Sequence, residues 1–128
     1  GMIGQLLTGV SGASAVYKGG VISYTNEVKQ NVLGVSAETL TTYGAVSEKT
    51  AEEMAVGARR TLNADAAVSV TGLAGPGGDD FGNPVGTVFI GFDSETKSEV
   101  KEFHFAGDRD SVRRQAAEEA LKLILENA

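Results

Sequence analysis

A chain of 128 residues is long enough for one domain that buries roughly two-thirds of the surface of its unfolded state. Its 17 acidic and 11 basic residues give a net charge of −6, which argues against a general surface for nucleic acid or acidic membranes. The absence of cysteine excludes disulfides, thiolate zinc sites and cysteine nucleophiles. No apolar run approaches the roughly 20 residues that span a bilayer and no basic signal segment opens the chain, so we expect a cytoplasmic protein.

The first predicted element is a short helix over residues 2–8, which two following glycines bring to an end. The next segment, AVYKGGVISYT (15–25), is rich in β-branched and aromatic residues. Such residues favour strands, and the two adjacent glycines at 19 and 20 favour a turn or bulge between them. We therefore expect strand pairing in this segment.

Three helices are predicted between residues 26 and 62. Asn26 is expected to cap the first helix, which would end at Gly34. Ser36 precedes the second helix, which would stop at Gly44, and Ser47 opens the longest one. The apolar residues of the longest helix keep helical spacing and predict a side that faces the core. They are Ala51, Met54, Ala55, Ala58 and Leu62.

The second half of the chain predicts three strands and a closing helix. The strands are AAVSV (66–70), GTVFIGF (86–92) and EVKEFHF (99–105), and Asp108 is expected to cap the helix. Alternating helices and strands predict a single α/β domain, a three-layer α/β/α sandwich with a mixed sheet. Ligands in such sheets favour the carboxyl ends of strands, where Thr71 begins a glycine-rich loop.

That loop lies within VTGLAGPGGDDFGNPVG (70–86), which holds both prolines of the chain. The stretch does not keep the spacing of a P-loop or of a G-x-G-x-x-G dinucleotide motif, and the chain has no G-x-S-x-G elbow. Gly75, Gly77 and Gly78 could direct backbone N–H groups at an anion, or they could simply make turns. Residues 79–83 are expected to be the mobile, solvated tip of the loop, with Asp79 and Asp80 in water rather than on a cation.

For two other candidate sites the sequence favours a structural role over a catalytic one. Ser94 and Lys97 match S-x-x-K, but they lie in the polar turn between two predicted strands and not on a rigid helix. His104 is the only histidine, in a predicted strand without a carboxylate or serine partner nearby in sequence. One histidine without further ligands does not make a zinc site, so we expect no metal.

A stronger candidate is Lys29, in the sequence YTNEVK (24–29). If Asn26 caps a helix there, Tyr24 ends the preceding segment and Lys29 emerges in the first turns of the helix. A lysine shielded at this corner would have a lowered pKa, because burial disfavours its charged form, and it could act as a base. A solvated surface lysine is the alternative.

Four segments in the same order resemble the C-terminal domain of the CinA family, the competence/damage-inducible proteins with nicotinamide-nucleotide amidase activity. They are GGVISYTNEVKQNVLGVSAETLTTYGAVSEKTAEEMAVGA, AAVSVTGLAGPGG, NPVGTV and GDRDSVRRQAAEEAL, which together cover nearly the whole chain. The resemblance implies hydrolysis of nicotinamide mononucleotide to nicotinate mononucleotide and ammonia by a serine that a lysine activates, without a cofactor or metal. It also implies a cytoplasmic homodimer that acts on a small nucleotide.

The family's motifs fall on particular residues of this chain. The tyrosine–x–asparagine–x–x–lysine motif falls on Tyr24, Asn26 and Lys29, which implies Lys29 as general base and Tyr24 as a positioning group. The threonine before the glycine loop falls on Thr71, and the glycine–aspartate–arginine motif implies Arg109 as an anion contact. The further residues implied for substrate binding are Gly72, Gly75, Gly77 and Gly78, with Arg113 as the alternative to Arg109.

The family's serine belongs to a serine–cysteine–threonine–glycine–glycine motif directly before the helix that corresponds to residues 2–8. Aligned on that helix, Gly1 takes the place of the last glycine, so the serine, and the helix and strand before it, would precede residue 1. We therefore expect residues 1–128 to form an N-terminally incomplete amidase domain with little or no activity of its own. The alternative is a non-catalytic module that binds nucleotides or proteins.

Overall fold

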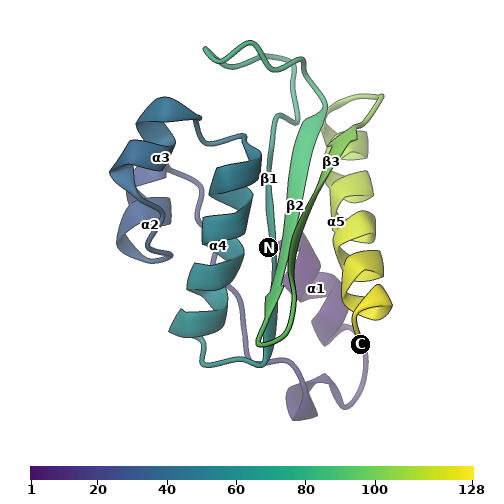
Figure 1. Ribbon diagram of the computed structural model, residues 1–128. Helices are drawn as coiled ribbons and strands as arrows, with labels where there is room; N and C mark the ends of the chain where they lie inside the picture. The colour runs from purple at the N-terminus through teal and green to yellow at the C-terminus, as the bar shows by residue number, and fades with distance from the viewer.

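The computed structural model describes residues 1–128 and has three layers (Figure 1). Its elements in chain order are α1 (Met2–Thr8), a short 3-10 helix (Ala13–Ala15), α2 (Asn26–Asn31), α3 (Ala37–Thr42), α4 (Glu48–Thr61), β1 (Ala66–Gly72), β2 (Thr87–Ser94), β3 (Ser98–His104) and α5 (Arg109–Glu126). The strands form one sheet in the order β1–β2–β3, with α4 on one face and α5 and α1 over the other. The predicted α/β/α sandwich is thus confirmed, but its three strands pair antiparallel throughout, so the sheet is not mixed.

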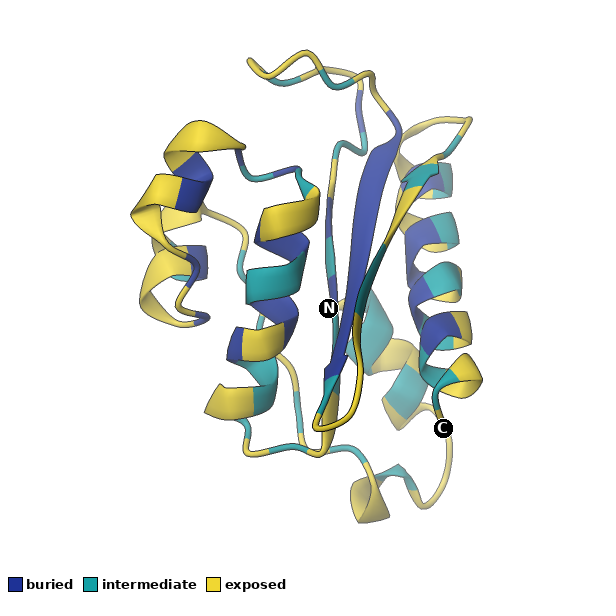
Figure 2. Ribbon diagram, viewed as in Figure 1, coloured by how far each residue is buried: buried dark blue, intermediate teal, exposed yellow.

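The central strand β2 is buried on both sides because helices cover both faces of the sheet (Figure 2). Successive side chains of a strand point to opposite faces, so two separate clusters share this strand. One cluster lies under α5 and consists of Val88, Ile90, Phe92, Val112, Ala116, Ala120 and Leu123. The other lies under α4, where Phe89 joins Val46 and Ala51. The continuous apolar run of β2 follows from this double coverage.

Helix α4 approaches its neighbours very closely. Ser69 Oγ donates a hydrogen bond of 2.6 Å to the carbonyl oxygen of Ala51, and a Cβ on Gly91 would lie 2.6 Å from the same oxygen. A Cβ on Gly57 would lie only 1.7 Å from the carbonyl oxygen of Leu33. Only small residues fit where the helix meets the sheet and the segment after α2.

A third apolar cluster attaches α2 and α3 to α4. It consists of Leu33, Val35, Leu40 and Met54. Of the core positions predicted for α4, Ala51, Met54 and Ala55 are buried, whereas Ala58 and Leu62, near the end of the helix, are half-buried. The helical spacing therefore gave the correct side of α4.

Polar side chains cap four of the helices, three of them as predicted. Ser36, Ser47 and Asp108 each accept a hydrogen bond from the backbone N–H three residues later. The cap of α2 is Thr25 and not Asn26: Thr25 Oγ1 accepts from Val28 N over 3.2 Å, and Asn26 is the first helical residue. None of the helices combines the length and the apolar character needed to cross a membrane.

The strands expected in residues 15–25 do not form. Ala13–Ala15 is a short 3-10 helix, and Lys18–Tyr24 is outside any regular element, with no hydrogen bond between its backbone and other backbone groups. A strand needs a neighbouring strand to pair with, and no other part of this chain pairs with these residues. The apolar side chains of Val16 and Ile22 remain exposed.

Candidate functional site

Lys29 is a buried lysine without an ion pair. Its side chain emerges from α2, the residue is 6% exposed, and no carboxylate lies within ion-pairing distance of it. Its Nζ donates hydrogen bonds to the backbone oxygens of Ser23 (2.9 Å) and Tyr24 (3.3 Å). Burial lowers the pKa of Lys29, because the charged ammonium is disfavoured away from water.

Local sequence explains why this lysine is enclosed. The chain turns sharply at the Thr25 cap, so the carbonyls of residues 23 and 24 lie beside the first turn of α2. After the helix the chain folds back again, and the backbone N–H of Val35 donates to the carbonyl oxygen of Lys29 over 3.1 Å. The buried side chains of Leu33 and Val35 then hold this turn on α4. Both flanks of Lys29 are thus closed by its own segment.

Tyr24 and Asn26 are near Lys29 in sequence but expose their side chains. Tyr24 is 81% exposed and contacts the lysine through its backbone oxygen, not through its phenol. Asn26 is exposed at the first position of α2. Neither side chain makes a hydrogen bond with Lys29 in the structure.

Thr71 lies at the carboxyl end of β1 and is buried. Its Oγ1 donates a hydrogen bond of 2.6 Å to the carbonyl oxygen of Ala45, in the connection between α3 and α4. Gly72 ends the strand and is exposed. Next to it, Leu73 N donates to Thr87 O and Gly86 N donates to Leu73 O, which closes the base of the loop between β1 and β2. Thr71 therefore ties the start of this loop to the α3–α4 connection.

The glycines of the loop differ in their surroundings. Gly75 is buried and has a φ of 96°, so a side chain there would be strained. A cis peptide bond joins it to Pro76. Gly77 and Gly78 are exposed, and a Cβ on either would meet no close contact. The backbone around Gly77 and Gly78 is therefore open to a ligand, whereas Gly75 shapes the turn.

Arg109, the first residue of α5, reaches this loop. Its Nη1 donates a hydrogen bond of 2.8 Å to the carbonyl oxygen of Gly75. Arg113, one turn later, is exposed, lies 3.7 Å from Asp110 and makes no hydrogen bond with the loop. Of the two predicted arginines, the structure brings only Arg109 to the glycine stretch.

The two halves of the candidate site meet through an apolar cluster. Ala45, which accepts the Thr71 hydrogen bond, packs against the cluster that contains Leu33 and Val35, the residues that follow the Lys29 helix. No hydrogen bond or ion pair joins Lys29 directly to Thr71 or Arg109. A single ligand would have to bridge the buried amine and the glycine loop.

Residues 79–83 are largely exposed, as expected for a loop tip, but hydrogen bonds hold them in a turn. Asp79 accepts hydrogen bonds from the backbone of Phe81 and Asn83 and from the Asn83 side chain. The aromatic ring of Phe81 lies against Gly44, and Asn83 Nδ2 also donates to Val46 O over 3.1 Å. An aspartate followed two and four residues later by donors could have indicated this turn, but its partner segment is distant in sequence.

The structure agrees with the prediction that Ser94 and Lys97 lie in a surface turn: Ser94 Oγ accepts from Lys97 N in the exposed turn after β2.

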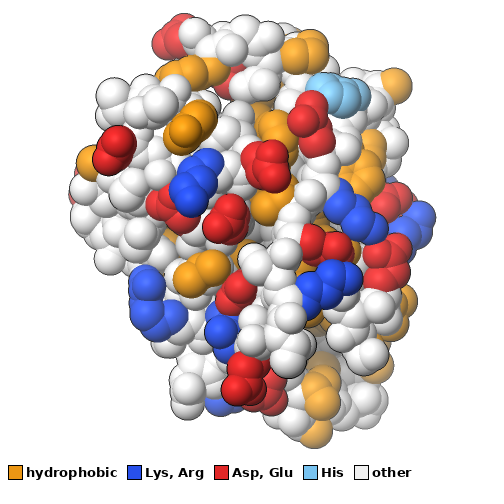
Figure 3. Space-filling view, viewed as in Figure 1, with side chains coloured by type: hydrophobic (Ala, Val, Ile, Leu, Met, Phe, Trp, Pro, Cys, Tyr) orange, Lys and Arg blue, Asp and Glu red, His pale blue; other side chains and the backbone are white.

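The expectation that His104 has no carboxylate partner is wrong, because its Nε2 lies 2.7 Å from Glu102 Oε2. Its Nδ1 lies 3.3 Å from Thr87 Oγ1. Figure 3 shows the histidine beside acidic side chains on a face where acidic and basic groups are intermixed. No three His, Asp or Glu side chains gather as a possible metal site.

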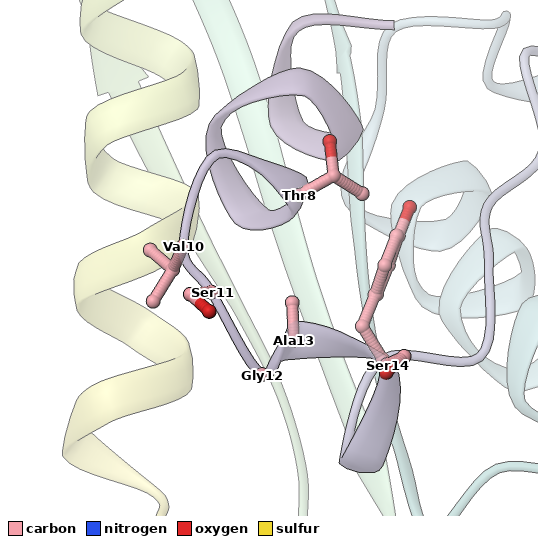
Figure 4. Close-up of a pocket in the computed structure, with 7 residues that line it drawn as sticks. Thr8, Val10, Ser11, Gly12, Ala13 and Ser14 are labelled. Atoms are coloured by element: carbon pink, nitrogen blue, oxygen red, sulfur yellow. The ribbon is translucent and has the colours of Figure 1, made fainter.

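An open pocket lies elsewhere. It has a volume of about 400 Å³ and is lined mainly by small and hydroxyl side chains between α1 and the 3-10 helix, including Thr8, Ser11 and Ser14 (Figure 4). In Figure 1 this region lies at the bottom of the sheet, whereas the loop after β1 is at the top. The pocket is therefore separate from the candidate site.

Comparisons with known proteins agree on one family. A model of the family described as CinA C-terminal domain matches residues 1–128. A CinA-like protein of Anaeromyxobacter sp. (strain K) is 51% identical over 124 residues, 97% of this chain and 30% of that protein. The crystal structure of a competence-damaged protein (CinA) superfamily protein from Escherichia coli is 34% identical with a TM-score of 0.97, covering 100% of this chain and 74% of that one. That of the competence/damage inducible protein CihA from Agrobacterium tumefaciens is 40% identical with a TM-score of 0.94, covering 98% and 78%. The chain spans about 30% of the length of the curated relatives it matches.

Proposed function

Because the chain belongs to the CinA C-terminal domain family, we propose that it serves as a nicotinamide-nucleotide amidase domain. The reaction would hydrolyse nicotinamide mononucleotide to nicotinate mononucleotide and ammonia. The observation that carries this proposal is Lys29, a buried amine with a lowered pKa and no acidic partner. A lysine at the surface stays protonated in water, whereas a lysine that acts as a general base must be neutral before it accepts a proton. A lowered pKa increases the neutral fraction.

The hydrogen bonds of Lys29 suit a general base. A neutral amine has two N–H groups and one lone pair, and two backbone carbonyls already accept from Nζ. With both N–H groups engaged by Ser23 O and Tyr24 O, the lone pair is directed at a third position, where it can accept a hydroxyl proton. In our proposal the hydroxyl is that of the serine that the family carries before the helix equivalent to α1. The proton would pass from the serine to Lys29 and then to the departing ammonia.

The glycine loop would bind the substrate. Serine attack on the carboxamide carbon creates negative charge on its oxygen, which exposed backbone N–H groups such as those at Gly77 and Gly78 could stabilise. Arg109 uses Nη1 to hold the Gly75 carbonyl, and its other nitrogen atoms remain for the substrate phosphate. Thr71, Gly72 and Asn26 would position the ligand, and water would then hydrolyse the acyl-enzyme.

The test compares Lys29→Met with a matched lysine variant in an N-terminally extended chain, which carries the family's serine motif before residue 1. Ammonia release from nicotinamide mononucleotide should fall by about 100-fold or more in Lys29→Met, the range for loss of a general base. Lys49 pairs with Glu52 at the surface, so Lys49→Met should keep the wild-type rate. Equal activity of the two variants would refute the role of Lys29, and no ammonia release by the wild-type protein would refute the amidase.

The second candidate function is nucleotide binding without catalysis. The Arg109–Gly75 contact and the open backbone at Gly77 and Gly78 do not depend on Lys29, so they support binding on their own. Calorimetric titration of the 128-residue chain with nicotinamide mononucleotide separates the two. Binding to this chain together with ammonia release by the N-terminally extended chain favours the amidase, whereas binding without ammonia release by either protein favours the second function.

A further inference from the structure

The turn Asp79–Asn83 is organised around one carboxylate. Asp79 Oδ1 accepts from Phe81 N over 3.1 Å and from Asn83 N over 3.0 Å, and Oδ2 accepts from Asn83 Nδ2 over 2.7 Å. The partial desolvation of Asp79 raises its pKa, but these three hydrogen bonds outweigh that effect and the pKa is lowered. The ionised carboxylate is therefore the form that holds the turn together.

The same turn is fastened to a distant part of the chain. Asn83 Nδ2 also donates to the carbonyl oxygen of Val46 over 3.1 Å, so one amide group joins the turn to the α3–α4 connection. The ring of Phe81 lies over Gly44, where an added Cβ would be 2.6 Å from the ring. Phe81 is still 50% exposed, so its contact with Gly44 covers only one side of the ring.

The α3–α4 connection is also held by a residue that precedes the glycine loop. Thr71, at the end of β1, donates to the carbonyl oxygen of Ala45, between the two residues that the turn contacts. The start of the loop and the turn at 79–83 are therefore both fixed to Gly44–Val46. The stretch Gly75–Gly78 lies between these two attachments.

We propose that Asp79, Phe81 and Asn83 form a latch that holds Gly75–Gly78 in the shape that binds the substrate, and that the three are positioning residues. This inference rests on the proposed function for the identity of the ligand. A glycine-rich stretch that is free in solution loses conformational freedom when it binds, and a latch formed beforehand removes part of that loss. The latch residues need not touch the substrate.

The two adjacent aspartates offer a matched comparison. Asp79→Ala removes all three hydrogen bonds, whereas Asp80 is exposed, makes no hydrogen bond and has the same charge. In hydrogen-exchange measurements on the 128-residue chain, we expect the Phe81 and Asn83 amides to exchange at least 10-fold faster in Asp79→Ala, and those of Asp80→Ala to match the wild type. Asn83→Ala, which removes both side-chain bonds of Asn83, is the second variant should Asp79→Ala unfold.

The role in substrate binding is tested in the N-terminally extended chain that carries the family's serine motif. We expect KM for nicotinamide mononucleotide to rise about 10-fold in Asp79→Ala with a smaller change in kcat, and neither to change in Asp80→Ala. Unchanged exchange in Asp79→Ala and Asn83→Ala overturns the latch. Faster exchange with unchanged KM overturns the positioning role. If the wild type neither binds nor hydrolyses the nucleotide, the proposed function and the positioning role fail together, while the exchange data still decide whether the latch exists.

Discussion

Replacing Thr71 with valine would remove one hydroxyl from the buried end of β1 and keep the shape of the side chain. The hydroxyl donates a 2.6 Å hydrogen bond to the carbonyl oxygen of Ala45, which is itself half-buried. Losing such a bond and leaving its acceptor poorly solvated costs about 1–2 kcal/mol. For a domain of this size, that cost corresponds to a fall in Tm of roughly 3–8 °C.

Thermal unfolding of the 128-residue chain, followed by circular dichroism, measures this change. Thr41→Val is the matched control, because Thr41 Oγ1 donates to Ala37 O at an exposed position of α3, and its Tm should stay within about 2 °C of the wild type. Thr71→Ser keeps the hydroxyl and loses only a methyl group. If Thr71→Val unfolds at the wild-type temperature while Thr71→Ser is destabilised, packing of the methyl group and not the hydrogen bond stabilises this site, and the reasoning is refuted.

Three further predictions concern pH and dynamics. The pKa of Lys29 is lowered from about 10.5 in the folded state, so the unfolded chain binds more protons between the two pKa values. In that pH range the free energy of unfolding of the wild type should therefore rise with pH relative to that of Lys29→Met. Denaturant titrations that give a difference independent of pH would contradict this. The pKa of Asp79 is lowered from about 3.8 in the folded state. The protection of the Asn83 amide from exchange, followed by NMR, should be complete above pH 3.8 and disappear as the pH falls through the pKa of Asp79 in the folded protein. Protection that persists when Asp79 is fully protonated would contradict this. Backbone amides of Lys18–Tyr24 have no backbone acceptor and should exchange at nearly the intrinsic rate, whereas those of β2 should be strongly protected in the same experiment.

The sequence predicted the elements that depend on local chemistry. Serine or aspartate before an apolar helical pattern correctly located three helix starts, because a cap involves residues only three positions apart. At α2, Thr25 and Asn26 are both capable caps and stand side by side, so the pattern was ambiguous by one residue. The sequence also identified Lys29 as a candidate base, but its burial depends on how the chain folds back after α2.

The sequence failed where a contact joins distant segments. Residues 15–25 have strand-forming composition, but composition does not reveal whether a neighbouring strand exists. The attachment of Phe81 and Asn83 to the α3–α4 connection crosses more than 30 residues and leaves no periodic signal. The His104–Glu102 pair could have been predicted from the sequence, since residues two apart in a strand share one face.

The close approach of α4 has a consequence for how this sequence can evolve. Gly57 faces the carbonyl oxygen of Leu33, and Gly91 faces that of Ala51 with the Ser69 hydroxyl beside it, so a main-chain oxygen obstructs a side chain at both positions. A larger residue at either site could not be accommodated by a complementary substitution in its partner. Over long divergence these two positions should therefore remain glycine while the apolar residues around them exchange freely for one another.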